Sequence, residues 1–326
     1  MSIEKEMEKY FDRLFPICRS ITGEGYQQSL NIIREIIPLE KIDFSSGTEC
    51  YDWTIPDEWN IRDAYITGPD GEKFARFKDN NLHVMGYSIP VDKELTLAEL
   101  QKHLHTLQEL PDAIPYVTSY YVRNWGFCLS YKDYRKLKDG TYRVYIDSEL
   151  KPGKLTIGVL TIPGETDKEI LLSTYLCHPS MAVNELSGPL VTAFLYKKLL
   201  AEKPLRHTIR FVYCPENIGA IAFLSKYGEQ LKEKLVAGYV VNCVGHGSLY
   251  TYKKSRRGNA LADRAALNVL KNQKLPFEVV DFFPDGSDER QYCSPGFNFP
   301  VGLIMRTMYG KYKEYHTSLD SKEIIS

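Results

Sequence analysis

The pattern of apolar and polar positions is most informative at residues 170–177, a short, largely apolar segment that ends before Pro179. Its length and its β-branched and aromatic residues are typical of a strand buried on both faces. After a polar loop, apolar residues recur at helical spacing over 190–199, and Pro189 suits the first turn of a helix. The pattern predicts a strand, a polar loop and a helix, an arrangement in which ligands bind where the strand ends.

The same alternation continues through the rest of the chain. Strands are predicted at 155–164, 169–177, 208–214, 236–245, 277–283 and 301–308, and helices from 188, at 218–235 and at 258–273. Strands that alternate with helices of this length imply right-handed crossovers and a mostly parallel sheet covered by helices. We therefore expect the polar residues that follow the strands to gather at one edge of the sheet.

Residues 47–153 have a different texture. Short segments rich in Tyr, Trp, Val, Ile and Thr are separated by turn signals such as GPDG and KDG, with one predicted helix at 95–107. Residues 1–37 instead predict two helices. The sequence thus predicts an α/β domain of residues 1–46 and 154–326, with a small β-rich domain of residues 47–153 inserted into it. His103 and His105 would point to different faces of the predicted helix, which argues against a shared metal site.

Composition and charge exclude some classes of function. The chain has 326 residues, 43% hydrophobic and 25% charged, with a formal net charge of −1. These values predict a soluble globular protein for which neither nucleic acid nor a membrane is the main partner. The first residues lack the apolar core of a signal peptide, so a cytoplasmic location is expected. The seven cysteines show no CxxC spacing and are interpreted as buried thiols in a reducing compartment.

Residues that carry chemistry share a position just beyond a predicted strand or in a late loop: His178, Glu185, Glu216, Asn242, His246, Asp285–Arg290 and His316. A histidine and carboxylates that converge from separate strand ends can form a zinc site with one position open for water. Glu216 would then be the general base. Each residue also has a structural interpretation, because a histidine can pack or cap, and Glu185 and Glu216 can satisfy free N–H groups at helix starts. The residues alone leave both interpretations open.

The order of these motifs resembles that of a known family. CHPS and NELSG, then PENIG, VVNCVG and YHTSLD are similar to the motifs of zinc aminopeptidases. The resemblance implies a three-layer α/β fold with a mostly parallel sheet of the zinc-aminopeptidase type. Phrases such as CRSITGEG, EWNIRDAYI and SRRGNAL extend the similarity to bacterial aminopeptidase-like proteins linked to polysaccharide biosynthesis, which carry an extra inserted domain. That closer resemblance covers nearly the whole chain.

The resemblance implies roles for individual residues. His178 matches the first metal ligand, Glu216 the general base and His316 the last ligand. An aminopeptidase also needs a carboxylate to hold the free amino group of its substrate, and Asp288 is a candidate for that role, which no motif fixes. Zinc lowers the pKa of a bound water, so that Glu216 could take its proton and later return it to the leaving amine.

The family's carboxylate ligands are missing at three places, where this chain has Asn184, Asn217 and Asn242. An amide is a much poorer zinc ligand than a carboxylate, which argues against a pair of ions. We expect one zinc ion per chain, held by His178 and His316 together with Glu185, the carboxylate next to Asn184.

Two functions from different classes follow. The first is a metal-dependent hydrolase that cleaves an amide bond in a small-molecule or peptide-like substrate. The second is a catalytically degenerate aminopeptidase-like scaffold that binds a ligand or partner. The resemblance links such a scaffold to polysaccharide biosynthesis. Arg256 and Arg257 in the basic stretch YKKSRRGN could grip a phosphate or carboxylate of the ligand, or form a solvated loop. A homo-oligomer, paired through a strand edge of the inserted domain, stays open.

Overall fold

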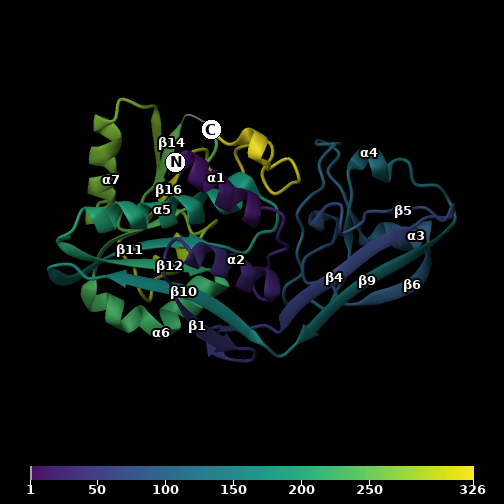
Figure 1. Ribbon diagram of the computed structural model, residues 1–326, viewed down its shortest axis with the longest axis horizontal. Coiled ribbons are helices and arrows are strands. Elements are labelled where there is room, and N and C mark those ends of the chain that lie inside the picture. The colour runs from purple at the N-terminus through teal and green to yellow at the C-terminus, as the bar shows by residue number, and fades with distance from the viewer. Residues whose placement is uncertain (1, 248) are drawn as a thin grey trace.

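The computed structural model describes residues 2–247 and 249–326, and in this part of the chain a large eight-stranded sheet carries helices on both faces (Figure 1). The strands lie in the order β1-β10-β12-β11-β13-β16-β14-β15. Their bounds are β1 Glu40–Ser45, β10 Lys154–Ile162, β11 Thr166–Tyr175, β12 His207–Cys214, β13 Leu235–Val241, β14 Tyr250–Lys253, β15 Phe277–Val280 and β16 Val301–Met305.

The middle of this sheet is parallel, as the alternation of strands and helices predicts. β12, β11, β13 and β16 are neighbours that run in one direction, whereas β1, β10 and β14 add antiparallel pairs on either side. Tyr175 of β11 pairs with Cys214 of β12, and Val240 of β13 lies opposite Ser173. The carboxyl ends of these strands therefore meet at one edge of the sheet, where the loops of the site begin.

Helices cover the two faces of the sheet with separate apolar cores. On one face α1 (Ile3–Leu14), α2 (Glu24–Arg34) and α5 (Ser187–Ala201) pack in a cluster with strand side chains such as Phe211. On the other face lie α6 (Ile218–Lys234) and the short α8 (Glu289–Tyr292). α7 (Leu261–Asn272) contacts β13 and β16. Helix α1 illustrates why these segments form helices that pack on the sheet. Ser2 caps its start, and only its apolar stripe is buried.

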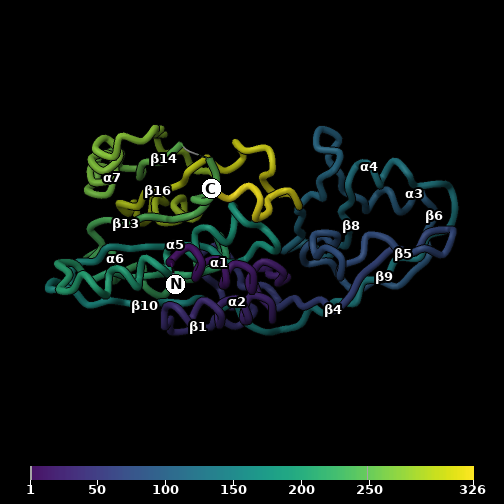
Figure 2. The backbone as a smooth tube through the Cα atoms, turned by 45° about the horizontal axis from the view of Figure 1, so that its top comes forward, coloured from purple at the N-terminus to yellow at the C-terminus, as the bar shows by residue number. Residues whose placement is uncertain are grey.

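A second, smaller sheet extends away from the large one along the long strands β4 and β9 (Figure 2). It runs in the order β5-β4-β9-β6, with β4 Glu58–Thr67, β5 Lys73–Phe74, β6 Val91–Thr96 and β9 Thr141–Lys151. The predicted alternation in β9 is confirmed, since Tyr142, Val144 and Ile146 are buried. Short elements complete this part: α3 Leu97–Leu100, α4 Tyr131–Tyr134, β7 Leu104–His105 and β8 Phe127–Cys128.

The hairpin of β2 (Glu49–Cys50) and β3 (Trp53–Thr54) contacts helix α6, which covers the large sheet. The hydroxyl of Tyr51 donates to the carbonyl oxygen of Leu224 in α6, at 3.2 Å. The hairpin thus lies against α6, although it belongs to the stretch that was predicted as the inserted domain.

The predicted helix at 95–107 is wrong beyond its first turn. Thr96 and Glu99 form a capping box that starts α3, but the chain passes through a 3₁₀ turn at Gln101–His103 into β7. Pairing of β7 with β8 outweighs the local helical pattern. His103 instead stacks on Trp125, with 3.8 Å between ring centroids. Among the described residues, no helix is long and apolar enough to cross a membrane.

Candidate metal and acid–base site

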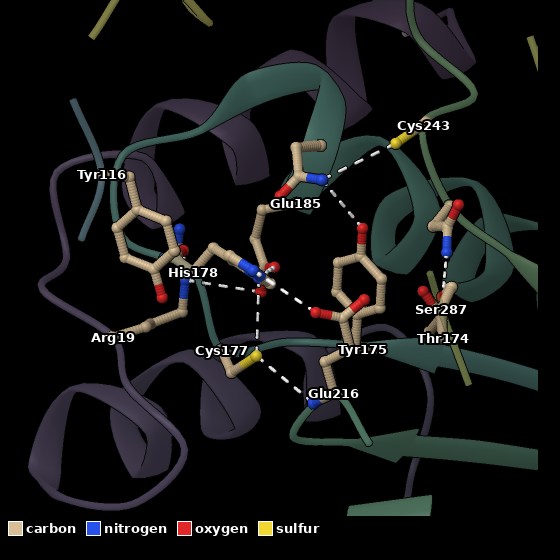
Figure 3. A network of polar contacts seen from close by, with 12 residues as sticks. Arg19, Tyr116, Thr174, Tyr175, Cys177, His178, Glu185, Glu216, Cys243 and Ser287 are labelled. Atoms are coloured by element: carbon tan, nitrogen blue, oxygen red, sulfur yellow. Dashed lines mark hydrogen bonds and ion pairs between the residues drawn. The ribbon is translucent and has the colours of Figure 1, made fainter. Parts of the chain in front are cut away.

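The site lies where β11 and β12 end. His178 follows β11, and Glu185 lies in a short π-helical segment, η3 (Ala182–Leu186), that leads directly into α5. Glu216 follows β12. Figure 3 shows His178 between the two carboxylates, which come from different loops at the same sheet edge.

His178 contacts a carboxylate on each side of its ring. Its Nδ1 lies 2.8 Å from Oε2 of Glu185, and its Nε2 lies 3.6 Å from Oε2 of Glu216. His178 and Glu185 are both buried, whereas the Glu216 side chain is 25% exposed. Burial lowers the pKa of His178, but the hydrogen bond and charge of Glu185 and the charge of Glu216 outweigh it, so the pKa is raised.

A buried arginine supports this pair from behind. Nε of Arg19 donates to the carbonyl oxygen of His178 at 3.0 Å and lies 3.9 Å from Oε1 of Glu185. Arg19 comes from the CRSITGEG loop between α1 and α2. The guanidinium compensates the charge of Glu185, a carboxylate that would otherwise be costly to bury.

Cys177 also contributes to the centre. Its Sγ lies 3.5 Å from Nδ1 of His178 and accepts the backbone N–H of Glu216 at 3.3 Å. Ligand atoms of Cys177, His178 and Glu185 all lie within 4.8 Å of one another. Sequence reasoning treated this cysteine as a small hydrophobic residue, and it missed the contact because Glu216 is distant in sequence.

The ring of His316 lies next to that of His178. The two ring centroids are 5.3 Å apart, and Tyr315 stacks on His316 at 3.9 Å. Burial and the charge of His178 lower the pKa of His316 to about 3, so its imidazole is neutral. Within the described chain its buried Nε2 has no hydrogen-bond partner. A neutral, unpartnered imidazole nitrogen is chemically suited to a metal ion.

Tyr116 closes the site from the inserted segment. Its ring lies 5.2 Å from that of His178 and 5.3 Å from that of His316, centroid to centroid. The backbone N–H of Tyr116 donates to the carbonyl oxygen of His316 at 2.8 Å. Its hydroxyl is 3.0 Å from that of Tyr120. The phrase IPYVTSYY, which contains both tyrosines, contributes to the family resemblance, but sequence reasoning gave them no role in the site.

Glu216 has the acidity of a general base. Burial raises its pKa to about 7; the charge of His178 lowers it, that of Glu185 raises it and that of Arg290 lowers it. A carboxyl group with this pKa both accepts and returns a proton near neutral pH. Asn217, which follows, has φ 59° and ψ −69°, and the N–H of Ile218 returns to the carbonyl oxygen of Glu216 at 2.7 Å. This γ-turn is a strained conformation of the kind found at functional sites.

Asp288 holds that turn instead of facing an open cleft. Its Oδ1 accepts the backbone N–H of Asn217 at 2.6 Å, and its side chain is fully buried near the thiol of Cys214. Burial raises the pKa of Asp288 well above its usual range. This buried side chain accepts a hydrogen bond from the backbone next to Glu216. In this conformation it is not accessible to the amino group of a substrate, the role for which it was a candidate.

The three asparagines make contacts within the protein. Nδ2 of Asn184 donates to the hydroxyl of Tyr175 at 3.0 Å, and Oδ1 of Asn217 accepts from Gln291 at 3.0 Å. Nδ2 of Asn242 donates to Ser287. They stand at the three positions where the resemblance to zinc aminopeptidases implies carboxylate ligands.

Other predicted residues lie apart from this centre. Arg256 and Arg257 are exposed, and Arg257 donates to the carbonyl oxygen of Asn298 at 2.8 Å. Among the described residues, neither arginine forms a hydrogen bond or ion pair with His178. His246 contacts the hydroxyl of Thr307 and stacks on Tyr312.

The residues present fit one divalent ion better than two. Carboxylate support of one imidazole nitrogen, as Glu185 gives to Nδ1 of His178, is a regular feature of metal-binding histidines. His316 offers a neutral imidazole beside it. Asn184, where the resemblance to zinc aminopeptidases implies a bridging carboxylate, has a neutral amide.

A sequence profile of the family described as a domain of unknown function, DUF4910, matches residues 8–326. The chain belongs to this family. A protein of Clostridium acetobutylicum is 48% identical over 316 residues, which are 97% of this chain and 72% of the relative. That relative is named provisionally as a polysaccharide biosynthesis protein with an aminopeptidase-like domain.

Solved structures confirm the predicted fold of this DUF4910 chain. A crystal structure from Clostridium acetobutylicum, named provisionally as a peptidase, matches with 46% identity and a TM-score of 0.95, over 99% of this chain and 76% of that one. A zinc aminopeptidase from Bacillus subtilis matches with a TM-score of 0.68 at 11% identity, over 99% of this chain and 89% of its own. The chain therefore has the aminopeptidase-type α/β fold; the more distant likeness shows the fold alone.

Proposed function

We propose that this protein is a metal-dependent hydrolase that cleaves an amide bond in an aminopeptidase-like manner. One observation carries the proposal: His178, supported by Glu185, faces Glu216 and lies beside the unpartnered imidazole of His316. The aminopeptidase-type fold and the names of the relatives support it.

His178, through Nε2, and His316 would hold one zinc ion per chain. Glu185 occupies Nδ1 of His178, and we propose that it orients this ligand rather than binding the ion itself. A bound divalent ion would polarise an amide carbonyl and make a water molecule more acidic.

Glu216 would move the proton. With a pKa of about 7 it can accept a proton from water and donate it to the leaving amine. The γ-turn at Asn217, held by Asp288, would fix its direction. Tyr116 and Tyr315 would restrict the space around the two histidines and exclude bulk water.

Metal content per chain tests the ligands. Mass spectrometry on protein purified without chelator should find about one ion, which His178→Ala and His316→Ala both lose. His207→Ala is the matched control, because His207 begins β12 at the opposite edge of the sheet. Absence of metal in the parent protein after incubation with zinc would refute this mechanism.

Hydrolysis tests the base separately. Aminoacyl and acylamino-sugar amides are suitable first substrates, because the relative's name links it to polysaccharide biosynthesis. Glu216→Gln should retain the metal and lose at least about 100-fold in kcat. Equal rates for this variant and the parent would exclude Glu216 as the base.

A second candidate is a catalytically degenerate scaffold that binds a ligand or partner. The observation that favours it is that Asn184, Asn217 and Asn242 replace carboxylates and bond to neighbouring side chains. The two candidates differ in the metal experiment, because a scaffold of this kind needs no ion at His178 and His316.

A further inference from the structure

A cavity of about 500 Å³ lies between the β2–β3 hairpin and the region of α6 and α8. Tyr51, Trp53 and Phe297 supply aromatic wall, and Arg290 and Gln291 supply polar groups. The volume falls in the range of pockets that bind small molecules.

Gln291 connects this cavity to the proposed catalytic carboxylate. It lines the cavity, and its Nε2 donates at 3.0 Å to Oδ1 of Asn217, the residue after Glu216. A molecule in the cavity would therefore lie next to the loop that carries the general base.

Arg290 lines this cavity and forms no ion pair in the described part of the chain. The two acids before it are committed elsewhere, since Asp288 binds the N–H of Asn217 and Glu289 pairs with the buried Lys253 at 2.7 Å. The sequence Asp-Glu-Arg thus turns two carboxylates inward and leaves the guanidinium half-buried at the cavity.

The remaining charges of the cavity do not cancel Arg290 directly. Lys232 and Glu229 also line it, but they pair with each other at 2.7 Å. Asp52, at the tip of the hairpin, is the other acid of the wall, and no ion pair joins it to Arg290 in the described residues. A guanidinium in this position can bind a carboxylate or phosphate through two parallel hydrogen bonds.

We propose that this cavity is a substrate subsite in which Arg290 binds an anionic group, a carboxylate or a phosphate. The aromatic side chains of Tyr51 and Phe297 would pack on the uncharged part of the same molecule. The role as a substrate subsite rests on the proposed hydrolase function, whereas anion binding itself can be measured without it.

The test adds three probes separately to the intact protein: N-acetylalanine, its uncharged analogue N-acetylalaninamide, and inorganic phosphate. Chemical shifts of the Arg290 Nε–H and the Gln291 side-chain amide report occupancy of the cavity. We expect shifts with one or both anions and none with the amide. Stronger binding of N-acetylalanine would identify a carboxylate, and stronger binding of phosphate a phosphate ester.

Variants assign the binding to Arg290. Arg290→Met should weaken anion binding at least about fivefold, whereas Arg135→Met, which removes an exposed arginine of the inserted segment, should not. Asp52→Asn should strengthen it about twofold, because it removes the opposing charge. Unchanged affinity in Arg290→Met, or equal binding of the uncharged amide, would overturn the proposal.

A further variant separates this proposal from the hydrolase function. Glu216→Gln should bind the anions at least as tightly as the parent does, because the guanidinium is unchanged and a nearby negative charge is removed. If the parent protein binds the anions, contains no metal after incubation with zinc and hydrolyses no amide, the hydrolase function is refuted and the anion site still stands. Once a hydrolysed substrate with an anionic group is known, Arg290→Met should raise KM about fivefold and leave kcat nearly unchanged, and the opposite pattern would contradict a binding role.

Discussion

At the scale of single residues, one imidazole organises the site by offering its two nitrogens to different carboxylates. Glu185 is seven residues away in sequence and Glu216 is 38 away, yet both reach the His178 ring. The nitrogen that each carboxylate meets decides its role, because one supports the ring and the other faces the space beyond it. The sequence predicted the grouping of these residues but not this division.

Glu216 should make folding stability depend on pH in the metal-free protein. Its folded pKa of about 7 is raised above the usual 4.5, so the unfolded chain releases this proton first as pH rises. The residue therefore costs stability progressively between about pH 4.5 and 7. Glu216→Gln avoids the cost and should be more stable than the parent at pH 8 by about 1 to 3 kcal/mol, a range reduced for its partial exposure.

Urea unfolding at pH 5, 6, 7 and 8 in the presence of a chelator measures this difference. Glu229→Gln, on the exposed side of α6, is the matched control for loss of a carboxylate. If the difference in unfolding free energy between Glu216→Gln and the parent stays constant across this pH range, the raised pKa of Glu216 is contradicted.

At the scale of elements, the π-helical segment η3 depends on a residue from the end of the chain. The carboxylate of Asp320 accepts the backbone N–H groups of Ala182, Val183 and Asn184 at 3.1, 2.7 and 2.9 Å. Tyr312 donates its hydroxyl to the same carboxylate at 3.1 Å. Asp320 thereby fixes the segment that carries Glu185. YHTSLD was singled out in the sequence for His316, and the structural role of its aspartate was not predicted.

Asp320→Ala should therefore loosen the site as well as the fold. It leaves the backbone N–H groups of Val183 and Asn184 buried without an acceptor, whereas Ala182 keeps its bond to the carbonyl oxygen of residue 320. The loss should cost at least about 2 kcal/mol of unfolding free energy. Hydrogen exchange should accelerate over residues 182–186, and metal binding should weaken because Glu185 loses its position. Asp139→Ala, at an exposed turn, is the control. Unchanged exchange over η3 would show that another contact holds this segment.

At the scale of the whole molecule, the inserted segment reaches over the strand ends of the large sheet. Ile114 and Ser318 exchange hydrogen bonds of 2.9 and 3.0 Å, next to the bond between Tyr116 and His316. The loop that carries Tyr116 thus pairs with the loop that carries His316. A site assembled in this way can gain selectivity from the inserted segment, although the chemistry belongs to the sheet.

Tyr116→Ala should open the site to reagents. We expect the metal-free variant to react with diethylpyrocarbonate at His316 several-fold faster than the parent, because the phenol ring no longer covers the imidazole. Peptide mapping by mass spectrometry locates the modified histidine. Tyr134→Ala, in α4, removes a tyrosine of the same segment away from the site. Equal rates at His316 in both variants would exclude Tyr116 as its cover.

The sequence singled out His316 through its motif YHTSLD. By itself it also predicted the order of strands and helices in the α/β part and the positions of His178 and Glu216 beyond strand ends. It could do so because buried parallel strands read as apolar runs, and because their loops all begin at one sheet edge. Tertiary structure decided what depends on distant partners: the antiparallel edges of the sheet, the early end of the helix after Leu100, and the contacts of Arg19, Tyr116 and Asp320. A local pattern records which face of an element is buried, whereas hydrogen bonds across 130 residues or more depend on how the elements pack.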